Sequence, residues 1–314
     1  MVIAVVAAGV LAAAMEVKAH AVERRAASQP ATVIGAATPL AIAAATTPAA
    51  AATTPAAAAL TTIPVLPPAP VTNTCAVTAG LAAAVAVAVG RGEQAGVAVL
   101  DTMTGAYVSA GSADTAFDTA SVVKVLIATQ LLLRGQMTAV TAQQMMVLSD
   151  DDAADALYGL AGGDDMVTDV AAHYGITLLG SAPADTGQWG ESTVTADGLA
   201  HLYAALKADP VVWPWLSQAM SAAQQTAADG TNQFFGIPAA TTGWAIKQGW
   251  MVGLGPGATY NTTGYVDGGR YVVVILTHGP VADYDSVLPA TLSAMARDVI
   301  PAGGVGAATA TCPA

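Results

Sequence analysis

A serine and a lysine three residues apart, Ser121 and Lys124, open a long apolar run of the sequence. On a helix this spacing puts both side chains on one face, so the amine lies within hydrogen-bonding reach of the hydroxyl. A serine hydroxyl is hardly ionised at neutral pH, and a lysine can accept its proton when burial or a second cation lowers the lysine pKa. The pair indicates a nucleophilic serine; a surface serine beside a solvated lysine is the other interpretation.

Two further polar patterns follow in the chain, and they are Ser149-Asp150-Asp151 and Lys247-Gln248-Gly249. The first falls in a polar turn between helical stretches at 142–148 and 153–159. The second lies in the alternating segment 244–251, which is typical of a strand. Lys247 would be the second cation that lowers the pKa of Lys124.

In this order the three patterns resemble the S-x-x-K, S-D-N and K-T-G set of class A β-lactamases and penicillin-binding proteins. They are also similar to the T-A-S-V-x-K, S-D-D and K-Q-G-W-M patterns of alanine-rich, envelope-anchored β-lactamase-like proteins of mycobacteria and related actinobacteria. The resemblance covers about residue 73 to the C-terminus. It implies an exported serine hydrolase that forms an acyl-serine intermediate with β-lactams or with peptidoglycan-related amides and esters, without a cofactor or metal.

The resemblance implies a role for each matching residue. Ser121 would be acylated, and Lys124 would accept its proton. Ser149 would relay a proton to the leaving nitrogen, while Lys247 would hold the substrate carboxylate and tune Ser149. The backbone N–H groups of Ser121 and Trp250 would form the oxyanion hole. The expected substrate-binding and oxyanion positions are Asp151, Gln248, Gly249 and Trp250.

Several residues depart from the pattern of that family. Asp151 stands where an asparagine amide would contact substrate, and its charge would favour the protonated form of Lys124. Gln248 replaces a hydroxyl residue that helps to bind the substrate carboxylate. The separation of Ser121 and Ser149, 149 minus 121 or 28 positions, predicts a trimmed helical lobe.

The glutamate that activates water for deacylation is also missing from its expected place, because residues 177–181 contain no carboxylate. Asp185 and Glu191 are the nearest acids, either as substitute bases or as ordinary loop and helix-start residues. Without a base an acyl-enzyme persists, so we expect weak deacylation. The alternative function is a catalytically degenerate envelope binding or scaffold module with the same fold.

The secondary-structure pattern predicts an α+β protein of the broad α/β class. We expect an antiparallel sheet of about five strands, flanked by helices and carrying an inserted helical lobe. The expected strands are 96–101, 107–112, 244–251, 259–266 and 271–277. The expected helices, besides those at Ser121 and Ser149, are 77–89, 164–174, 195–206 and 284–300, and Asp118 and Thr119 are candidates to cap the Ser121 helix.

Composition divides the chain into three parts. Residues 1–25 contain an apolar run from Val2 to Met15, which suits a signal peptide, a marginal membrane anchor or a soluble alanine-rich helix. Residues 26–72 are rich in Ala, Thr and Pro and predict a semi-extended linker. Residues 73–314 form the predicted hydrolase domain, which we expect to be a monomer.

Two cysteines and a strongly acidic composition limit where the protein can be located and which partners it can bind. Cys75 and Cys312 lie at the edges of the predicted domain, where a disulfide would clip its ends; two free thiols are the alternative. A bridge favours a secreted or cell-envelope protein. A net charge of -12 with only 10 Lys and Arg argues against nucleic-acid binding, and no His or Cys spacing suits zinc.

Overall fold

The computed structural model describes residues 74–177, 179–253, 257–302 and 304–306. The predicted anchor, the linker and their boundaries lie outside these residues and stay predictions. Cys75 lies in the first turn of helix α2 (Thr74–Gly90), whereas Cys312 lies outside the described residues, so their bridge also stays a prediction. Within the described part of the chain, no helix combines the length and apolar character needed to cross a membrane.

A five-stranded antiparallel sheet forms the centre of the fold, with strand order β2-β1-β8-β7-β6. The strands are β1 (Gln94–Asp101), β2 (Tyr107–Gly111), β6 (Ala245–Val252), β7 (Gly257–Val266) and β8 (Tyr271–Pro280). Because β1 pairs with β8, the early hairpin and the late strands build one sheet from both ends of the domain. The expected fold class is thereby confirmed.

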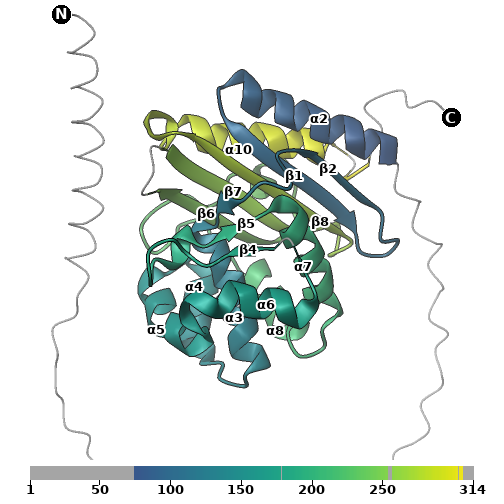
Figure 1. Ribbon diagram of the computed structural model, residues 1–314. Coiled ribbons are helices and arrows are strands. Elements are labelled where there is room, and N and C mark those ends of the chain that lie inside the picture. The colour runs from purple at the N-terminus through teal and green to yellow at the C-terminus, as the bar shows by residue number, and fades with distance from the viewer. Residues whose placement is uncertain (1–73, 178, 254–256, 303, 307–314) are drawn as a thin grey trace, which may run out of the picture. The chain divides into compact units, whose positions relative to one another are not determined.

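Alternating apolar side chains give this sheet two buried faces. On β1, Val97 and Val99 belong to the core under α2 and the last helix, α10 (Val287–Val299). Ala98 and Leu100 point to the opposite face and join the core of the helical lobe. Figure 1 shows α2 and α10 side by side on one face of the sheet, with the lobe on the other.

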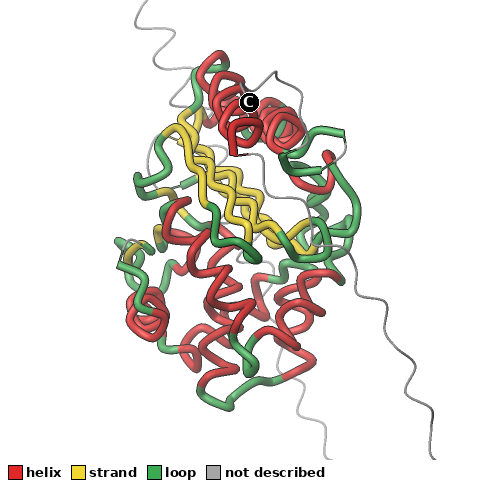
Figure 2. Tube along the Cα trace, turned by 90° about the vertical axis from the view of Figure 1, so that its right-hand side faces the viewer, coloured by secondary structure: helices red, strands yellow, loops and turns green. Residues whose placement is uncertain are grey.

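The lobe is the chain between β2 and β6. Its helices are α3 (Lys124–Leu133), α4 (Ala139–Val147), α5 (Asp151–Ala161), α6 (Met166–Tyr174), α7 (Ala196–Ala208) and α8 (Trp213–Ser221), followed by the short α9 (Ile237–Ala240). A small sheet of order β3-β5-β4 joins Phe117–Asp118, Thr193–Val194 and Gly180–Ser181. In Figure 2 the main sheet lies between this lobe and the α2/α10 pair.

Most elements agree with the sequence-based expectations, but several features were missed. The hairpin is present, with Leu100 opposite Tyr107. Helices α8 and α9, the β3-β5-β4 sheet and the 3₁₀ turns were not predicted. One of these turns, η1 (Ala120–Val123), precedes α3, so Ser121 lies in a tighter turn than an α-helix start.

Candidate active site

The backbone around Ser121 is held in an uncommon conformation. Ala120 adopts a φ of 45°, which is in the left-handed region that residues other than glycine rarely adopt. The predicted capping of this turn is wrong, because no side chain caps it. The Thr119 hydroxyl donates instead to the Gly190 carbonyl at 3.3 Å, and its N–H donates to the Ser192 carbonyl at 2.8 Å. A neighbouring segment thus bonds to the residue that precedes the turn, in place of a side-chain cap.

Lys124 is fully buried and faces Ser121, as its spacing predicts. Its Nζ donates to Ser121 Oγ at 2.9 Å, to the Ser149 carbonyl at 2.7 Å and to Asp151 Oδ1 at 2.5 Å. Ser149 Oγ lies 3.4 Å away as a fourth acceptor. An ammonium group has three N–H donors, so the protein's own oxygens already saturate this amine.

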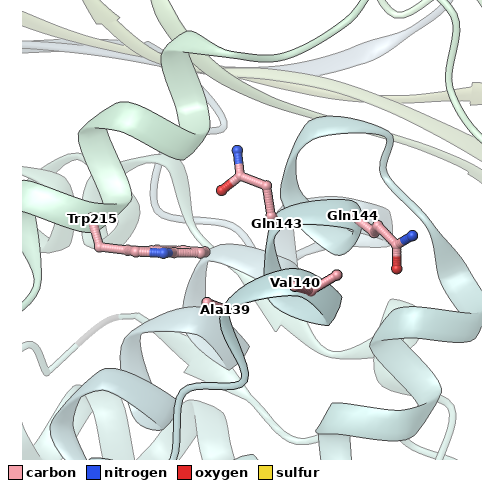
Figure 3. A pocket seen from close by; sticks show the side chains of 5 residues that line it. All are labelled: Ala139, Val140, Gln143, Gln144 and Trp215. Carbon is pink, nitrogen blue, oxygen red and sulfur yellow. The ribbon is translucent and has the colours of Figure 1, made fainter. Parts of the chain in front are cut away.

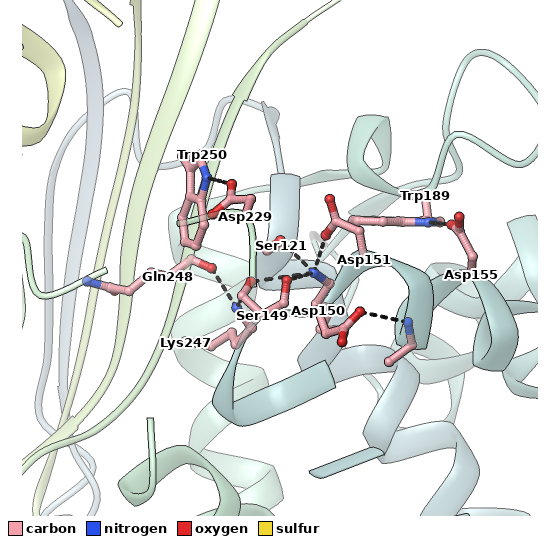
Figure 4. A network of polar contacts seen from close by, with 12 residues as sticks. Ser121, Ser149, Asp150, Asp151, Asp155, Trp189, Asp229, Lys247, Gln248 and Trp250 are labelled. Atoms are coloured by element: carbon pink, nitrogen blue, oxygen red, sulfur yellow. Dashed lines mark hydrogen bonds and ion pairs between the residues drawn. The ribbon is translucent and has the colours of Figure 1, made fainter. Parts of the chain in front are cut away.

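Ser149 lies between the two lysines. Its φ of 54° is again left-handed, at the junction where α4 ends and Asp150 caps α5 by accepting from the Ala153 N–H at 3.1 Å. Lys247 Nζ donates to Ser149 Oγ at 2.8 Å and to the Gln248 carbonyl at 2.9 Å. Figure 4 shows Ser121, Ser149 and Lys247 gathered in one network, so the structure brings the four predicted catalytic side chains together.

Burial lowers the pKa of both lysines. For Lys124 the nearby Asp151 carboxylate opposes this effect but does not cancel it. The pKa of Lys247 is well below its ordinary value, first because of burial and second because of the Lys124 charge. The Lys124 charge thus adds to burial in lowering the pKa of Lys247, while the expected effect of Lys247 on the pKa of Lys124 stays a prediction.

Gly249 permits strand β6 to approach the serine turn. A Cβ atom on this residue would lie 2.6 Å from the Thr119 carbonyl oxygen and 3.1 Å from Val122 Cγ2. On the adjacent strand, Asn261 Nδ2 donates to the carbonyls of Asp118, at 2.9 Å, and of Thr119, at 3.2 Å. Gly249 and Asn261, which are paired across β6 and β7, thereby set the spacing between Lys247 and Ser121.

The structure does not bring the Gln248 side chain to the serines. Its amide donates to the carbonyls of Phe235 at 2.7 Å and Gln233 at 3.2 Å, and Figure 4 shows it directed away from Ser149. Successive residues of a strand point to opposite faces, and Lys247 already occupies the face toward the site. The side chain therefore points away from the serines, Gln248 contributes its carbonyl to Lys247, and its expected role in binding substrate stays a prediction.

Two tryptophans flank the network. Trp250, an expected site residue, has its ring centre 5.9 Å from Lys247 Nζ, and its indole N–H donates to Asp229 at 3.0 Å. Trp189 was not predicted; its ring centre lies 4.9 Å from Lys124 Nζ, and its indole N–H donates to Asp155 at 2.7 Å. Trp189 and Asp155 lie on the far side of Ser121 from Trp250 and Asp229 in Figure 4.

The segment expected to provide the deacylating base, residues 177–181, contains no carboxylate. Of the two substitute acids, Asp185 is exposed, and Glu191 is partly buried at the end of the 3₁₀ turn η3 (Trp189–Glu191). The residue of this turn that faces Lys124 is Trp189. The suggestion that Asp185 or Glu191 acts as a substitute base stays a prediction.

A separate hollow of about 410 Å³ lies on the lobe between α4 and α8 (Figure 3). Its lining residues are Ala139, Val140, Gln143, Gln144 and Trp215. Since this lining contains no nucleophilic or ionisable side chain, the hollow does not compete with the Ser121 region as a catalytic site.

Solved structures of β-lactamases share this fold. A β-lactamase from Xanthomonas campestris has 18% sequence identity and a TM-score of 0.56, over 71% of this chain and 97% of that chain. An ancestral class A β-lactamase has 21% identity and a TM-score of 0.54, over 71% and 98% of the two chains. The architecture described above is therefore that of a class A β-lactamase.

The chain belongs to the Beta-lactamase enzyme family, whose family model matches residues 136–300, more than half of its 314 residues. The match includes Ser149 and Lys247 but begins after Lys124. Curated relatives from Mycobacterium tuberculosis and Mycobacterium bovis, named "Putative lipoprotein LppW", are 33% identical over 233 residues, covering 69% of this chain and 73% of theirs.

Proposed function

We propose that this protein is an exported serine hydrolase that forms an ester between Ser121 and the acyl group of a β-lactam or a peptidoglycan-related amide or ester. The observation that carries the proposal is the 2.9 Å contact between the buried Lys124 amine and Ser121 Oγ. Burial lowers the pKa of that amine, which favours the neutral form able to take the serine proton.

Acylation follows from the four side chains in order. Ser121 Oγ attacks the carbonyl carbon while its proton passes to neutral Lys124, and the carbonyl oxygen becomes an oxyanion held by the backbone N–H groups of Ser121 and Trp250. The carbon–nitrogen bond then breaks. The leaving nitrogen takes a proton from Ser149 Oγ, which recovers one from Lys124 or Lys247, both within hydrogen-bonding distance of it.

The absent carboxylate at 177–181 supports slow release of this ester. Asp151 supports the same view of a modest catalyst, because its carboxylate stabilises the protonated form of Lys124. A catalytically degenerate binding or scaffold module is the second candidate. The saturation of Lys124 by Asp151 and the inward-turned Gln248 side chain favour that alternative.

A cell-envelope location fits the proposed activity. The curated relatives carry the name of a lipoprotein, and the apolar run near the start of this chain suits a signal peptide or an anchor. We propose that the protein is secreted or attached to the membrane through its N-terminal part and that it acts as a monomer on a small-molecule substrate. No cofactor or nucleic acid enters the proposal.

Intact-mass spectrometry of the full chain after incubation with a penicillin and with a D-alanyl-D-alanine thioester tests the proposal. We expect a stable adduct of one acyl group on the wild type and none on Ser121→Ala. Ser181→Ala, which changes an exposed serine of β4, is the matched control and should form the adduct. If the wild type neither forms an adduct nor consumes either ligand, the scaffold alternative replaces the enzyme.

A further inference from the structure

We infer that Trp189 is a cover that keeps water away from the Ser121–Lys124 pair and prolongs the life of the acyl-enzyme. This role rests on the proposed function and assigns one side chain to its slow step. Trp189 is a positioning residue in this scheme, because it acts by excluding water rather than by bonding to the substrate.

The first observation is the place of the Trp189 ring. Its centre lies 4.9 Å from Lys124 Nζ, within the range in which an aromatic face attracts an ammonium group. The same amine donates hydrogen bonds to Ser121, Ser149 and Asp151. In its protonated form, with three donors used and an indole above it, Lys124 has no N–H left to donate to a water molecule.

The second observation is that three hydrogen bonds hold Trp189 and its turn. Its Nε1 donates to Asp155 on α5 at 2.7 Å. The next residue, Gly190, accepts from the Thr119 hydroxyl, and the Ser192 carbonyl accepts from the Thr119 N–H at 2.8 Å. The turn that carries the indole is therefore bonded both to α5 and to the backbone just before Ser121.

Deacylation requires a water molecule and a base, and the Trp189 side chain supplies neither. A water oxygen must bond to the acyl carbon, the bond from that carbon to Ser121 Oγ must break, and the water proton must pass to a base while Oγ regains a proton. An indole has one N–H donor and no proton acceptor, and here Asp155 occupies that donor. Trp189 thus takes up space beside the ester without activating water.

The first test measures the lifetime of the Ser121 ester formed with a penicillin, by mass spectrometry after removal of excess ligand. We expect the ester to decay at least about tenfold faster in Trp189→Ala, equivalent to about 1.4 kcal/mol. Asp155→Ala should also shorten it, whereas Asp155→Asn keeps an acceptor for the indole and should preserve it. Trp215→Ala, in the separate hollow, is the matched tryptophan control and should decay like the wild type.

The second test does not need acylation and so separates this inference from the proposed function. The full chain is treated with cyanate, a small reagent for amines, and carbamoylation of Lys124 is followed by peptide mass spectrometry. We expect Lys124 to react several-fold faster in Trp189→Ala and Asp155→Ala than in the wild type or Trp215→Ala. Unchanged Lys124 reactivity would overturn the covering role of Trp189. An unchanged ester lifetime in a protein that does acylate would overturn it as well.

A wild type that never acylates but shows the cyanate difference would retain the cover and reject the hydrolase. The reverse result, acylation with no effect of Trp189→Ala on lifetime, would retain the hydrolase and reject the cover. Thermal unfolding of each variant is measured as a control. A general loss of structure would also make the other buried amine, Lys247, react faster with cyanate.

Discussion

The surroundings of Lys124 and of Lys247 are built alike but differ in one charge. Each has a buried lysine, a tryptophan ring near its amine and an aspartate on the indole N–H. Lys124 also has a carboxylate, Asp151, 2.5 Å from its Nζ. Among the described residues Lys247 forms no ion pair, and its Nζ donates to the neutral oxygens of Ser149 and Gln248.

This difference gives the two amines different electrostatic surroundings. The Asp151 carboxylate opposes the effect of burial on Lys124, while burial and the Lys124 charge act together to lower the pKa of Lys247. Because Ser149 Oγ lies within hydrogen-bonding distance of both amines, a proton can pass between them through this hydroxyl. Ser149 is thus the link between two groups of unequal basicity.

Replacing each lysine with methionine gives the largest expected effect and tests which amine serves Ser121. We expect Lys124→Met to slow acylation by about 10³-fold and Lys247→Met by about 10²-fold, since general acid–base groups contribute 10² to 10⁴. The rate of adduct formation with a penicillin measures both. An equal or larger loss in Lys247→Met would make Lys247 the base and break the distinction.

A change in the spacing between the two sides comes next. Gly249→Ala would bring a Cβ within 2.6 Å of the Thr119 carbonyl, so β6 must shift from η1. We expect a loss of about 3 kcal/mol in the free energy of unfolding, measured in urea. Gly159→Ala, in α5 with no atom near its added Cβ, is the control and should be slightly stabilising. Equal behaviour of the two variants would show that β6 is free to move.

The pH dependence of stability sharpens the comparison. A lysine whose pKa is lowered in the folded protein binds fewer protons there than in the unfolded chain, so the free energy of unfolding rises with pH between the folded pKa and about 10.4. Lys247→Met should reduce this slope by up to about 1.4 kcal/mol per pH unit inside that window.

Urea unfolding of the wild type and Lys247→Met between pH 7 and 9.5 measures the slope, and the difference between them cancels the other titrating groups. Lys124→Met should reduce the slope less, because Asp151 holds the pKa of Lys124 closer to its ordinary value. Parallel curves for the wild type and Lys247→Met would contradict the lowered pKa of Lys247.

Removing the charge that distinguishes the two sides gives the smallest expected effect. In Asp151→Asn the pKa of Lys124 falls, so its neutral form appears at lower pH and acylation at pH 7 should rise by about tenfold. The pH profile of adduct formation should move to lower pH. Asp152→Asn, the neighbouring exposed acid in the first turn of α5, should leave the profile unchanged. A fixed profile in Asp151→Asn would mean that this carboxylate does not control Lys124.

The sequence predicts the parts of this site that depend on local periodicity. The spacing of Ser121 and Lys124 and the alternation around Lys247 are local signals, and the structure brings these residues together. The same alternation also predicts that Gln248 points away from Lys247, a signal that the family resemblance overrode. Helix α8 carries a proline in its first turn, which is a recognisable start signal as well.

Other features have no local signal at all. Trp189 lies over Lys124 in a turn that bonds to the Thr119 backbone and hydroxyl, and those contacts join positions about seventy residues apart. The short strands β3, β4 and β5 contain two residues each, too few to show a period. The Asp229 contact with Trp250 likewise depends on how a turn folds back over β6. Such tertiary contacts cannot be read from the residues that make them.

The pairing of β1 with β8 has a consequence for how the protein folds. Gln94 pairs with His278, so the central strand pair cannot form until most of the chain is available, and contacts this distant slow folding. The lobe helices need only nearer contacts. We expect pulsed hydrogen exchange to protect amides of α3 and α5 before those of β1, so that Ser121 and Lys124 meet early and Lys247 reaches them last.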